Sequence, residues 1–300
     1  MDSLPADHLA KSVQFTPRLH YDVYQAIEPG NPELSLAGKV VMVTGASRGI
    51  GSRGIVPSLA KAGASGIILA ATNAEKLKAV ESSVQEINSS SQTLIVASDV
   101  SKEESVVNLF NVAVEVFGRV DVLVHNAGVM GELSNIHEAD PEAWWRSFEV
   151  NTFGTFLVCK HFLKIQPASK GPGTIVFITS AAGWQSNPLM SGYSGGKLAA
   201  QKLLGDIAAG YPNVNTFSVE PGLVETDMLS PAFKKFNLSS PGLVGGTVVW
   251  LISDQAKFLS GRAISANWDV EDLADKREEI MKEDLLTIAM RGKFGAQHFQ

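Results

Sequence analysis

Short apolar runs rich in β-branched residues alternate with longer amphipathic stretches from residue 39 onward. Apolar runs without polar alternation are typical of parallel strands whose two faces are both covered by helices. The pattern therefore predicts an α/β fold, a doubly wound parallel sheet of about seven strands with right-handed crossovers and helices on both faces. The predicted strands are residues 39–45, 66–72, 92–99, 120–126, 173–180, 213–221 and 261–267.

The remaining segments complete this picture. The first part of the chain shows no clear period, so we predict an extended N-terminal arm, residues 1–38, lying over the body. No repeat or low-complexity linker divides residues 39–300, which we therefore predict to form a single domain. The predicted helices are residues 50–62, 74–88, 102–117, 141–166, 191–209 and 242–253, with a charged terminal helix at 271–291.

Composition argues against several classes of protein. A net charge of −6 disfavours binding to nucleic acid or to an anionic membrane, because either partner requires a basic surface. The single cysteine, Cys159, excludes an internal disulfide and fits the reducing cytoplasm. No stretch approaches the ~18 apolar residues of a membrane span, and no signal peptide is evident. The histidines lack metal-binding spacing, so we predict no metal in the chemistry.

A glycine-rich turn follows the first predicted strand. It reads TGASRGIG, residues 44–51, with glycines at 45, 49 and 51. Glycines at a strand-to-helix turn let the backbone approach a pyrophosphate, which then sits at the positive end of the helix. The turn therefore predicts a dinucleotide site.

The helix after this turn has an unusual sequence. It continues SRGIVPSLAKAGA, which is one residue longer than usual before the next strand and contains Gly54 and Pro57. Because proline removes a backbone donor, we predict a kink or bulge in this helix.

The stretch SGYSGGKLAA, residues 191–200, places Tyr193 and Lys197 four residues apart, on one face of a helix. Between them stand Gly195 and Gly196, although each glycine costs about 1 kcal/mol inside a helix. We predict that the two glycines allow close packing against the sheet, a neighbouring helix or another subunit.

Together these features resemble the short-chain dehydrogenase/reductase (SDR) family of the single-domain type. Further matches follow in order from residue 39 to 226, and the arm and the stretch SANWDVEDL resemble fungal members. The resemblance implies a Rossmann fold for the catalytic domain, 39–300, with a lid at 223–241 and a helical tail at 271–300. The matching residues are Asp99 after the third strand, Asn126, Ala127 and Gly128 after His125, Asn151 in the predicted helix 141–166, Ser180 thirteen residues before Tyr193, and Pro221, Gly222 and Thr226.

The resemblance implies that Ser180, Tyr193, Lys197 and Asn151 are catalytic. Reduction of a carbonyl leaves an alkoxide that needs a proton, and a phenol with an ordinary pKa near 10 gives one up only if acidified. A positive charge on Lys197 favours the phenolate. Ser180 can hydrogen-bond the substrate oxygen, and Asn151 can hold a water that returns a proton through Lys197.

The form of the cofactor follows from the second strand. Ala71 stands where NAD-preferring enzymes of this fold carry an acid, and Arg48 in the glycine turn is available for a 2′-phosphate. We therefore predict NADP(H) in preference to NAD. The cofactor-binding residues implied are Gly45, Ser47, Arg48, Gly49, Ile50, Gly51, Thr72, Asp99, Val100, Asn126, Ala127, Gly128, Tyr193, Lys197, Pro221, Gly222, Val224 and Thr226.

The segments beyond the strand ends are apolar, which favours a hydrophobic ketone or secondary alcohol as substrate. Trp184, Leu189, Met190 and Met228 are the predicted substrate-binding residues. The primary hypothesis is an NADP(H)-dependent oxidoreductase with Tyr193 as general acid or base. A redox-neutral isomerase or dehydratase and a non-catalytic NADP-binding regulator are the alternatives. The resemblance also implies a homodimer or homotetramer that pairs through the helices carrying Asn151 and Tyr193.

Overall fold

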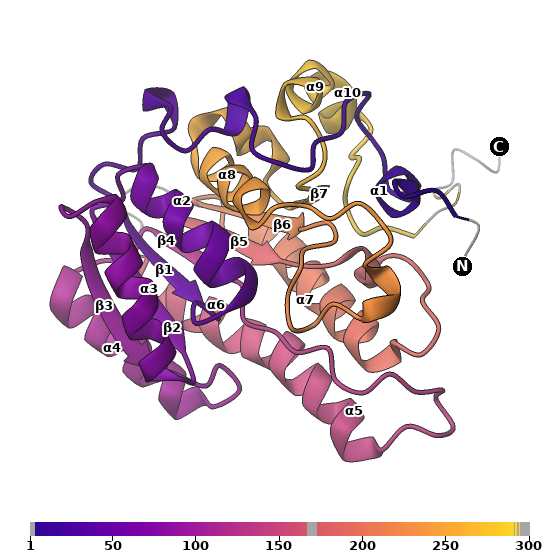
Figure 1. The fold of residues 1–300 in the computed structure, drawn as a ribbon, viewed down its shortest axis with the longest axis horizontal. Coiled ribbons are helices and arrows are strands. Elements are labelled where there is room, and N and C mark those ends of the chain that lie inside the picture. Colours follow the sequence, from indigo (N-terminus) through magenta and orange to yellow (C-terminus); the bar gives the residue numbers. More distant parts are fainter. Residues whose placement is uncertain (1–3, 167–172, 291, 293, 295–300) are drawn as a thin grey trace.

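The computed structural model describes residues 4–166, 173–290, 292 and 294, and its strands form one parallel sheet (Figure 1). The seven strands of this described part run in the order β3-β2-β1-β4-β5-β6-β7. The order reverses between β1 and β4, and ligands bind where strand order reverses in such sheets. The predicted doubly wound parallel sheet is thus confirmed. Its strands are β1 Val40–Thr44, β2 Gly66–Ala71, β3 Gln92–Ala97, β4 Val122–His125, β5 Gly173–Ile178, β6 Val214–Glu220 and β7 Arg262–Ser265.

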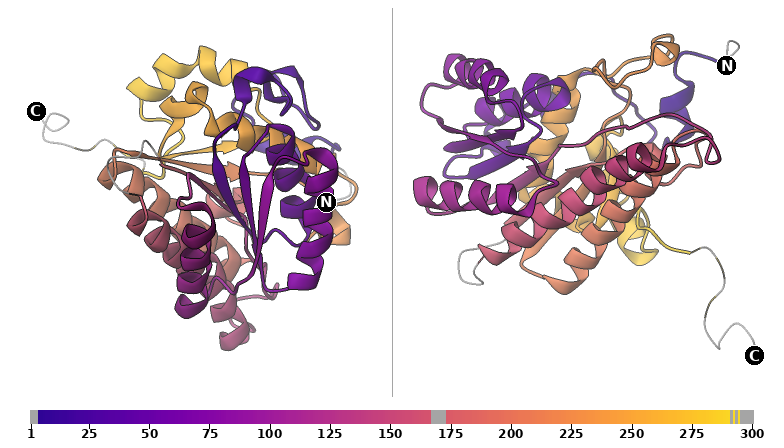
Figure 2. Two further views of the ribbon diagram at one scale, coloured as in Figure 1. Left: turned by 90° about the vertical axis from the view of Figure 1, so that its left-hand side faces the viewer. Right: turned by 90° about the horizontal axis from the view of Figure 1, so that it is seen from below.

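Helices cover both faces of the sheet (Figure 2). Alternate residues of β1 belong to two cores: Val41 and Val43 pack in one, and Val40 and Met42 in the other. The first core lies under α2 Val56–Lys61, α3 Ala74–Ile87 and α8 Pro241–Ile252. The second lies under α4 Glu103–Phe117, α6 Gly154–Lys164 and α7 Ser191–Gly210. In the described part of the chain, no helix is long and apolar enough to cross a membrane.

The predicted irregularity after the glycine turn is confirmed. Residues Gly51–Ile55 form a π-helical segment, and α2 follows it directly. A π turn accommodates one extra residue in a helix. This explains how the segment can have one residue more than is usual between the glycine turn and the next strand. A side chain at Gly54 would overlap the carbonyl oxygen of Pro241, so the glycine permits α8 to start against this turn.

A second π-helical segment interrupts the predicted helix 141–166. It covers Glu149–Phe153 and joins α5 Pro141–Phe148 to α6. Asn151 therefore lies in a π turn, a feature that occurs often at functional sites.

The predicted terminal helix at 271–291 is wrong in its extent. The structure has two short helices there, α9 Val270–Asp275 and α10 Arg277–Lys282. Beyond Lys282 the chain leaves the helix because Leu286 O accepts a hydrogen bond from Ala263 N at the free edge of β7, at 2.9 Å. Pairing with this edge overrides the helical preference of the sequence. Residues 291, 293 and 295–300 of the predicted tail lie outside the described residues.

The N-terminal arm runs over α8 and α9 (Figure 1). It contains one short helix, α1 His8–Ser12, and two single 3₁₀ turns, Gln25–Ile27 and Pro32–Leu34. Leu19 makes an isolated antiparallel bridge with Trp268. The arm thus lies against the segment that follows β7, far away in the sequence.

Candidate active site

A cavity of about 410 Å³ lies at the reversal of strand order. The glycine turn after β1, the segment after β4, the start of α7 and the loop after β6 all contribute to its wall. Most of the predicted site residues line this cavity, whereas Gly51, Asn151, Trp184, Leu189 and Met190 do not. Those that line it are Gly45, Ser47, Arg48, Gly49, Ile50, Thr72, Asp99, Val100, Asn126, Ala127, Gly128, Ser180, Tyr193, Lys197, Pro221, Gly222, Val224, Thr226 and Met228.

The glycine turn presents bare backbone to the cavity. Gly45 has a φ of 65°, and a Cβ there would lie 2.8 Å from the backbone of Ala127. A Cβ at Gly51 would overlap the carbonyl oxygen of Gly45. The Asn126 amide donates to Gly45 O at 2.9 Å and so ties the end of β4 to the turn. A close turn without side chains at the start of a helix fits the pyrophosphate of a dinucleotide.

Two arginines line the cavity among the residues that the structure describes. Arg48 Nη1 lies 3.2 Å from Asp227 Oδ2, and both side chains are largely exposed. Arg146, which the sequence analysis missed, bonds Glu149 at 2.6 Å and lies 3.6 Å from Asp99. Because an exposed ion pair is weak, Arg48 is the arginine that a new anion can recruit more easily.

Ser180 and Tyr193 line the cavity together, Ser180 just after β5 and Tyr193 in the first turn of α7. Ser180 follows β5 and caps a single turn, because its hydroxyl accepts a hydrogen bond from Ala182 N at 3.2 Å. Burial raises the pKa of the Tyr193 phenol, and a hydrogen bond with Ser180 opposes this effect. Tyr193 is therefore a weaker acid than free tyrosine.

Lys197 is buried with 4% of its surface exposed. Its Nζ donates to Ile178 O at 2.8 Å and lies 4.7 Å from the centre of the Phe177 ring. No carboxylate of the described chain forms an ion pair with it. Burial lowers the pKa of Lys197 to about 7. A lysine with this pKa exchanges its proton near neutral pH, which suits a proton relay.

Asn151 lies beside Lys197 but bonds elsewhere. Its Oδ1 accepts from Val129 N at 3.0 Å, and its Nδ2 donates to Val129 O at 2.7 Å. A Cβ added to Gly128 would be 2.9 Å from Asn151 Oδ1 and 3.2 Å from Lys197 Nζ. Asn151 thus fixes the segment after β4 next to the lysine, and its water-binding role stays a prediction.

The predicted substrate residues lie in different places. Met228 lines the cavity, together with Met130, Leu223 and Leu229. Trp184 instead lines a second cavity of about 1130 Å³. Leu189 adopts a φ of 68°, and Met190 immediately precedes α7. Trp184, Leu189 and Met190 therefore do not line the cavity that holds Tyr193.

A buried acid, Glu220, was missed by the sequence analysis. Its Oε1 accepts from Gly222 N at 2.8 Å, and its Oε2 accepts from the Ser265 hydroxyl at 2.6 Å. Burial raises the pKa of this carboxyl. Glu220 directly precedes the predicted Pro221–Gly222 loop in the sequence. No pattern near Glu220 indicates that Ser265 on β7 is its hydrogen-bond partner.

The two glycines of α7 behave differently. A Cβ at Gly196 would lie 3.2 Å from Asn151 Cβ and 3.4 Å from Thr152 Oγ1, whereas one at Gly195 would find only Phe148, at 3.7 Å. The Thr152 hydroxyl also donates to Gly196 O at 3.0 Å. The predicted close packing against a neighbouring helix is therefore confirmed for Gly196.

Comparison with known proteins identifies the family of this chain. The model of the short chain dehydrogenase family matches residues 39–237. The chain is 35% identical over 283 residues to short chain dehydrogenase mpl6 of Monascus purpureus, covering 91% of this chain and 95% of that protein. It is 35% identical over 284 residues to short chain dehydrogenase pigC of Monascus ruber, covering 91% and 92%. A solved short chain dehydrogenase from Shigella flexneri 2a str. 301, complexed with NADP, superposes with a TM-score of 0.70 at 27% identity, covering 79% of this chain and 99% of that one.

Proposed function

Because the chain belongs to the short chain dehydrogenase family, we propose that it transfers a hydride between NADP(H) and a hydrophobic ketone or secondary alcohol. The observation that carries this proposal is one cavity that contains both a bare glycine turn and the Ser180–Tyr193–Lys197 group. A module that only bound the dinucleotide would need the first and not the second.

We propose the following roles for the side chains in this cavity. The nicotinamide cofactor, when bound, supplies or accepts the hydride at the carbonyl carbon. The Ser180 hydroxyl holds the substrate oxygen, and Tyr193 gives that oxygen its proton during reduction or removes it during oxidation. Since burial raises the Tyr193 pKa, the phenol needs a positive charge on Lys197 to act at neutral pH.

The preference for NADP(H) is supported by Arg48 and by Ala71 at the end of β2, where an acid would repel a 2′-phosphate. We expect Arg48→Ala to raise the KM for NADPH about tenfold and to leave the KM for NADH nearly unchanged, because a lost charge-assisted bond costs about this much. The matched control is Arg53→Ala in the π-helical segment that follows the turn, since Arg53 bonds the backbone of Glu225 and does not line the cavity. Equal effects of Arg48→Ala on both cofactors would remove the assignment.

The substrate class is supported by the methionines and leucines near Tyr193 in the cavity wall. The decisive experiment incubates the protein with NADPH and a panel of hydrophobic ketones, and measures the loss of NADPH absorbance together with the alcohol formed. Stoichiometric conversion supports the proposal. Conversion without net oxidation of NADPH would instead support an isomerase or dehydratase.

Self-association is supported by exposed aromatic residues on the helix that carries Asn151. Trp145, Phe153 and Phe156 are exposed large side chains on α5, the π turn and α6. We propose that they are covered in a homodimer or homotetramer. Phe156→Lys should then lower the mass measured by light scattering, whereas a mass already equal to one chain in the unmodified protein would contradict the proposal. A cytoplasmic location is likewise our proposal and rests on the sequence alone.

A further inference from the structure

The N-terminal arm lies outside the residues that match the family, 39–237, yet it contacts the lid of the cavity. We propose that the arm is a brace that positions the lid, residues 223–241, and the Pro221–Gly222 loop, and that Asn267 is the positioning residue at its centre. This inference rests on the function proposed above for the cavity.

The arm bonds the end of the lid directly. Tyr21 O accepts from Ser240 N at 2.7 Å, and the Asp22 carboxylate accepts from the Ser240 hydroxyl at 2.6 Å. Nearer the N-terminus, Ala6 O accepts from Asn237 N at 2.8 Å. The chain that leaves the lid is therefore held by the arm and by α8, which Ser240 caps through a bond from Leu243 N.

Asn267 joins the arm to this end of the lid. Its Nδ2 donates to His20 O at 2.7 Å and to the Ser239 hydroxyl at 2.8 Å. His20 N donates back to Asn267 O at 2.8 Å. Because both hydrogens of the side-chain amide are used and only 2% of the residue is exposed, Asn267 has one arrangement that satisfies its donors.

The same residue limits where the Pro221–Gly222 loop can lie. Gly222 has a φ of 71°, and a Cβ there would overlap Asn267 Oδ1 and lie 2.6 Å from Ser239 Oγ. On its other side, Gly222 N is held by Glu220. Ser239 N donates to Leu223 O at 2.6 Å, so the two ends of the lid meet beside Asn267.

The lid in turn forms part of the cavity wall. Val224, Thr226 and Met228 lie on it and line the cavity. Thr226 Cγ2 would be 3.3 Å from a Cβ at Gly49, so the lid reaches the glycine turn. A shift where the ends of the lid meet therefore changes the cavity wall both at the Pro221–Gly222 loop and at the glycine turn.

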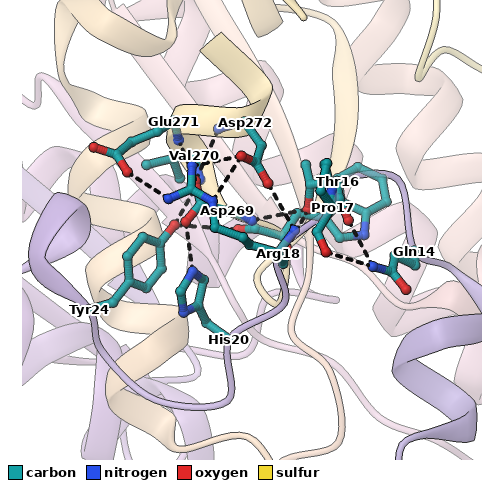
Figure 3. Close-up of polar contacts among 11 residues, drawn as sticks. Gln14, Thr16, Pro17, Arg18, His20, Tyr24, Asp269, Val270, Glu271 and Asp272 are labelled. Carbon is teal, nitrogen blue, oxygen red and sulfur yellow. Dashed lines mark hydrogen bonds and ion pairs between the residues drawn. The ribbon is translucent and has the colours of Figure 1, made fainter. Parts of the chain in front are cut away.

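The arm itself is fixed by a cluster of charges, which we call the clasp: Arg18, His20, Asp269, Glu271 and Asp272 (Figure 3). Arg18 lies 2.8 Å from Asp269 and 2.6 Å from Asp272, and His20 lies 2.7 Å from Asp269. Because the clasp holds the arm in place, the arm can also hold Ser240 and Asn267 in place through its hydrogen bonds to them.

The test compares Asp22→Ala with Asp22→Asn, which keeps an acceptor for Ser240. Asp22 is exposed and does not line the cavity, so both variants should fold. Without cofactor, we expect Asp22→Ala to speed hydrogen exchange of the lid amides about tenfold, with little change elsewhere, because an interaction with a charged acceptor is lost. The KM for the substrate should rise severalfold with kcat nearly unchanged, and Asp22→Asn should restore most of both.

Asn267→Asp provides an independent variant, because it keeps the shape of the side chain and removes both donors. Faster exchange confined to the lid supports the brace. Unchanged lid exchange in Asp22→Ala and in folded Asn267→Asp would overturn it, as would faster exchange spread evenly over the whole chain. Exchange is measured without substrate, so a failure to find NADPH-dependent turnover would overturn the proposed function and leave this test intact.

Discussion

Lys197 and Arg18 are two cations with opposite surroundings. Lys197, in the cavity wall, is buried beside a carbonyl oxygen and an aromatic ring, and burial lowers its pKa to about 7. Arg18, in the clasp, is half-exposed and lies within 3.1 Å of three carboxylates, and its hydrogen bond with Asp272 is the main cause of its raised pKa.

The difference separates two purposes of charge. In the clasp, three carboxylates share Arg18, and these contacts join the N-terminal arm to the segment that follows β7. The cavity keeps Lys197 without a carboxylate, which costs stability, and a buried group with a shifted pKa is typical of a functional site. We therefore expect substitutions in the cavity to reduce activity while sparing or raising stability, and substitutions in the clasp to reduce stability.

The largest expected effect is on turnover. Tyr193→Phe removes the proton donor and should lower kcat/KM by about 10²- to 10⁴-fold, the usual contribution of general acid catalysis. Steady-state assays with NADPH and an accepted ketone measure this, and Tyr211→Phe, at an exposed position, is the control. Retention of more than about a tenth of the activity by Tyr193→Phe would assign the proton to another group.

The next effect concerns stability and its dependence on pH. Unfolded lysine keeps its proton up to about pH 10.5, whereas folded Lys197 loses it above about 7. The unfolded state therefore binds more protons between these values, and stability rises with pH by up to about 1.4 kcal/mol per pH unit. Lys197→Met should be more stable than the natural protein at pH 7, with the difference shrinking toward pH 9. Urea unfolding at several pH values measures this.

The control for that experiment is Lys202→Met, since Lys202 is exposed and paired with Asp206. Its unfolding curve should follow the natural protein at every pH. Parallel pH profiles for Lys197→Met and the natural protein would show that Lys197 carries no electrostatic cost.

The clasp should show the opposite behaviour. Asp269, 1% exposed, accepts from Arg18 and His20 and also caps α9 through Glu271 N and Asp272 N. Asp269→Ala should lower the free energy of unfolding by about 3 kcal/mol, combining a lost helix cap with lost bonds to a charged group. Asp269→Asn retains the capping oxygen and should lose less. If chemical denaturation found the alanine variant as stable as the natural protein, the clasp would have no structural role.

The smallest expected effect concerns the two glycines of α7. It tests whether they lower the stability of the helix near the site. Gly195→Ala meets only ordinary contact with Phe148 and should raise stability by about 0.5–1 kcal/mol, the usual gain for such a change in a helix. Gly196→Ala presses on Asn151 and Thr152 and should gain less or lose stability. Thermal unfolding of the pair compares them, and identical shifts would mean that the packing at Gly196 is unimportant.

The sequence was sufficient wherever the signal was local. Buried parallel strands are continuous apolar runs, so the predicted strand 39–45 differs from β1 Val40–Thr44 by a residue at each end. The glycine turn and the Tyr193–Lys197 spacing are likewise short patterns. The kink predicted from Gly54 and Pro57 is a π turn, which an extra residue in a helix requires.

The rest depended on contacts between distant parts of the chain. Asn267 and His20 are 247 residues apart, and nothing in either neighbourhood indicates the other. Helix α10 ends at Lys282 because Leu286 is hydrogen-bonded to the edge strand β7. Helix propensity cannot reveal this contact. Trp184 lines the second cavity and not the one that holds Tyr193, and the sequence could not tell which way its side chain points.

The π turn around Asn151 is a place where the length of the chain can change without rotating the helix that follows. A π turn takes up one more residue than an α turn, so the extra residue is absorbed within Glu149–Phe153 and α6 continues from Gly154. Deleting one residue here should restore an ordinary helical turn and leave Phe156 on the same exposed face of α6. The position of Asn151 against Val129 would change instead, so a change of length at this place acts on the interior of the molecule and spares its outer surface.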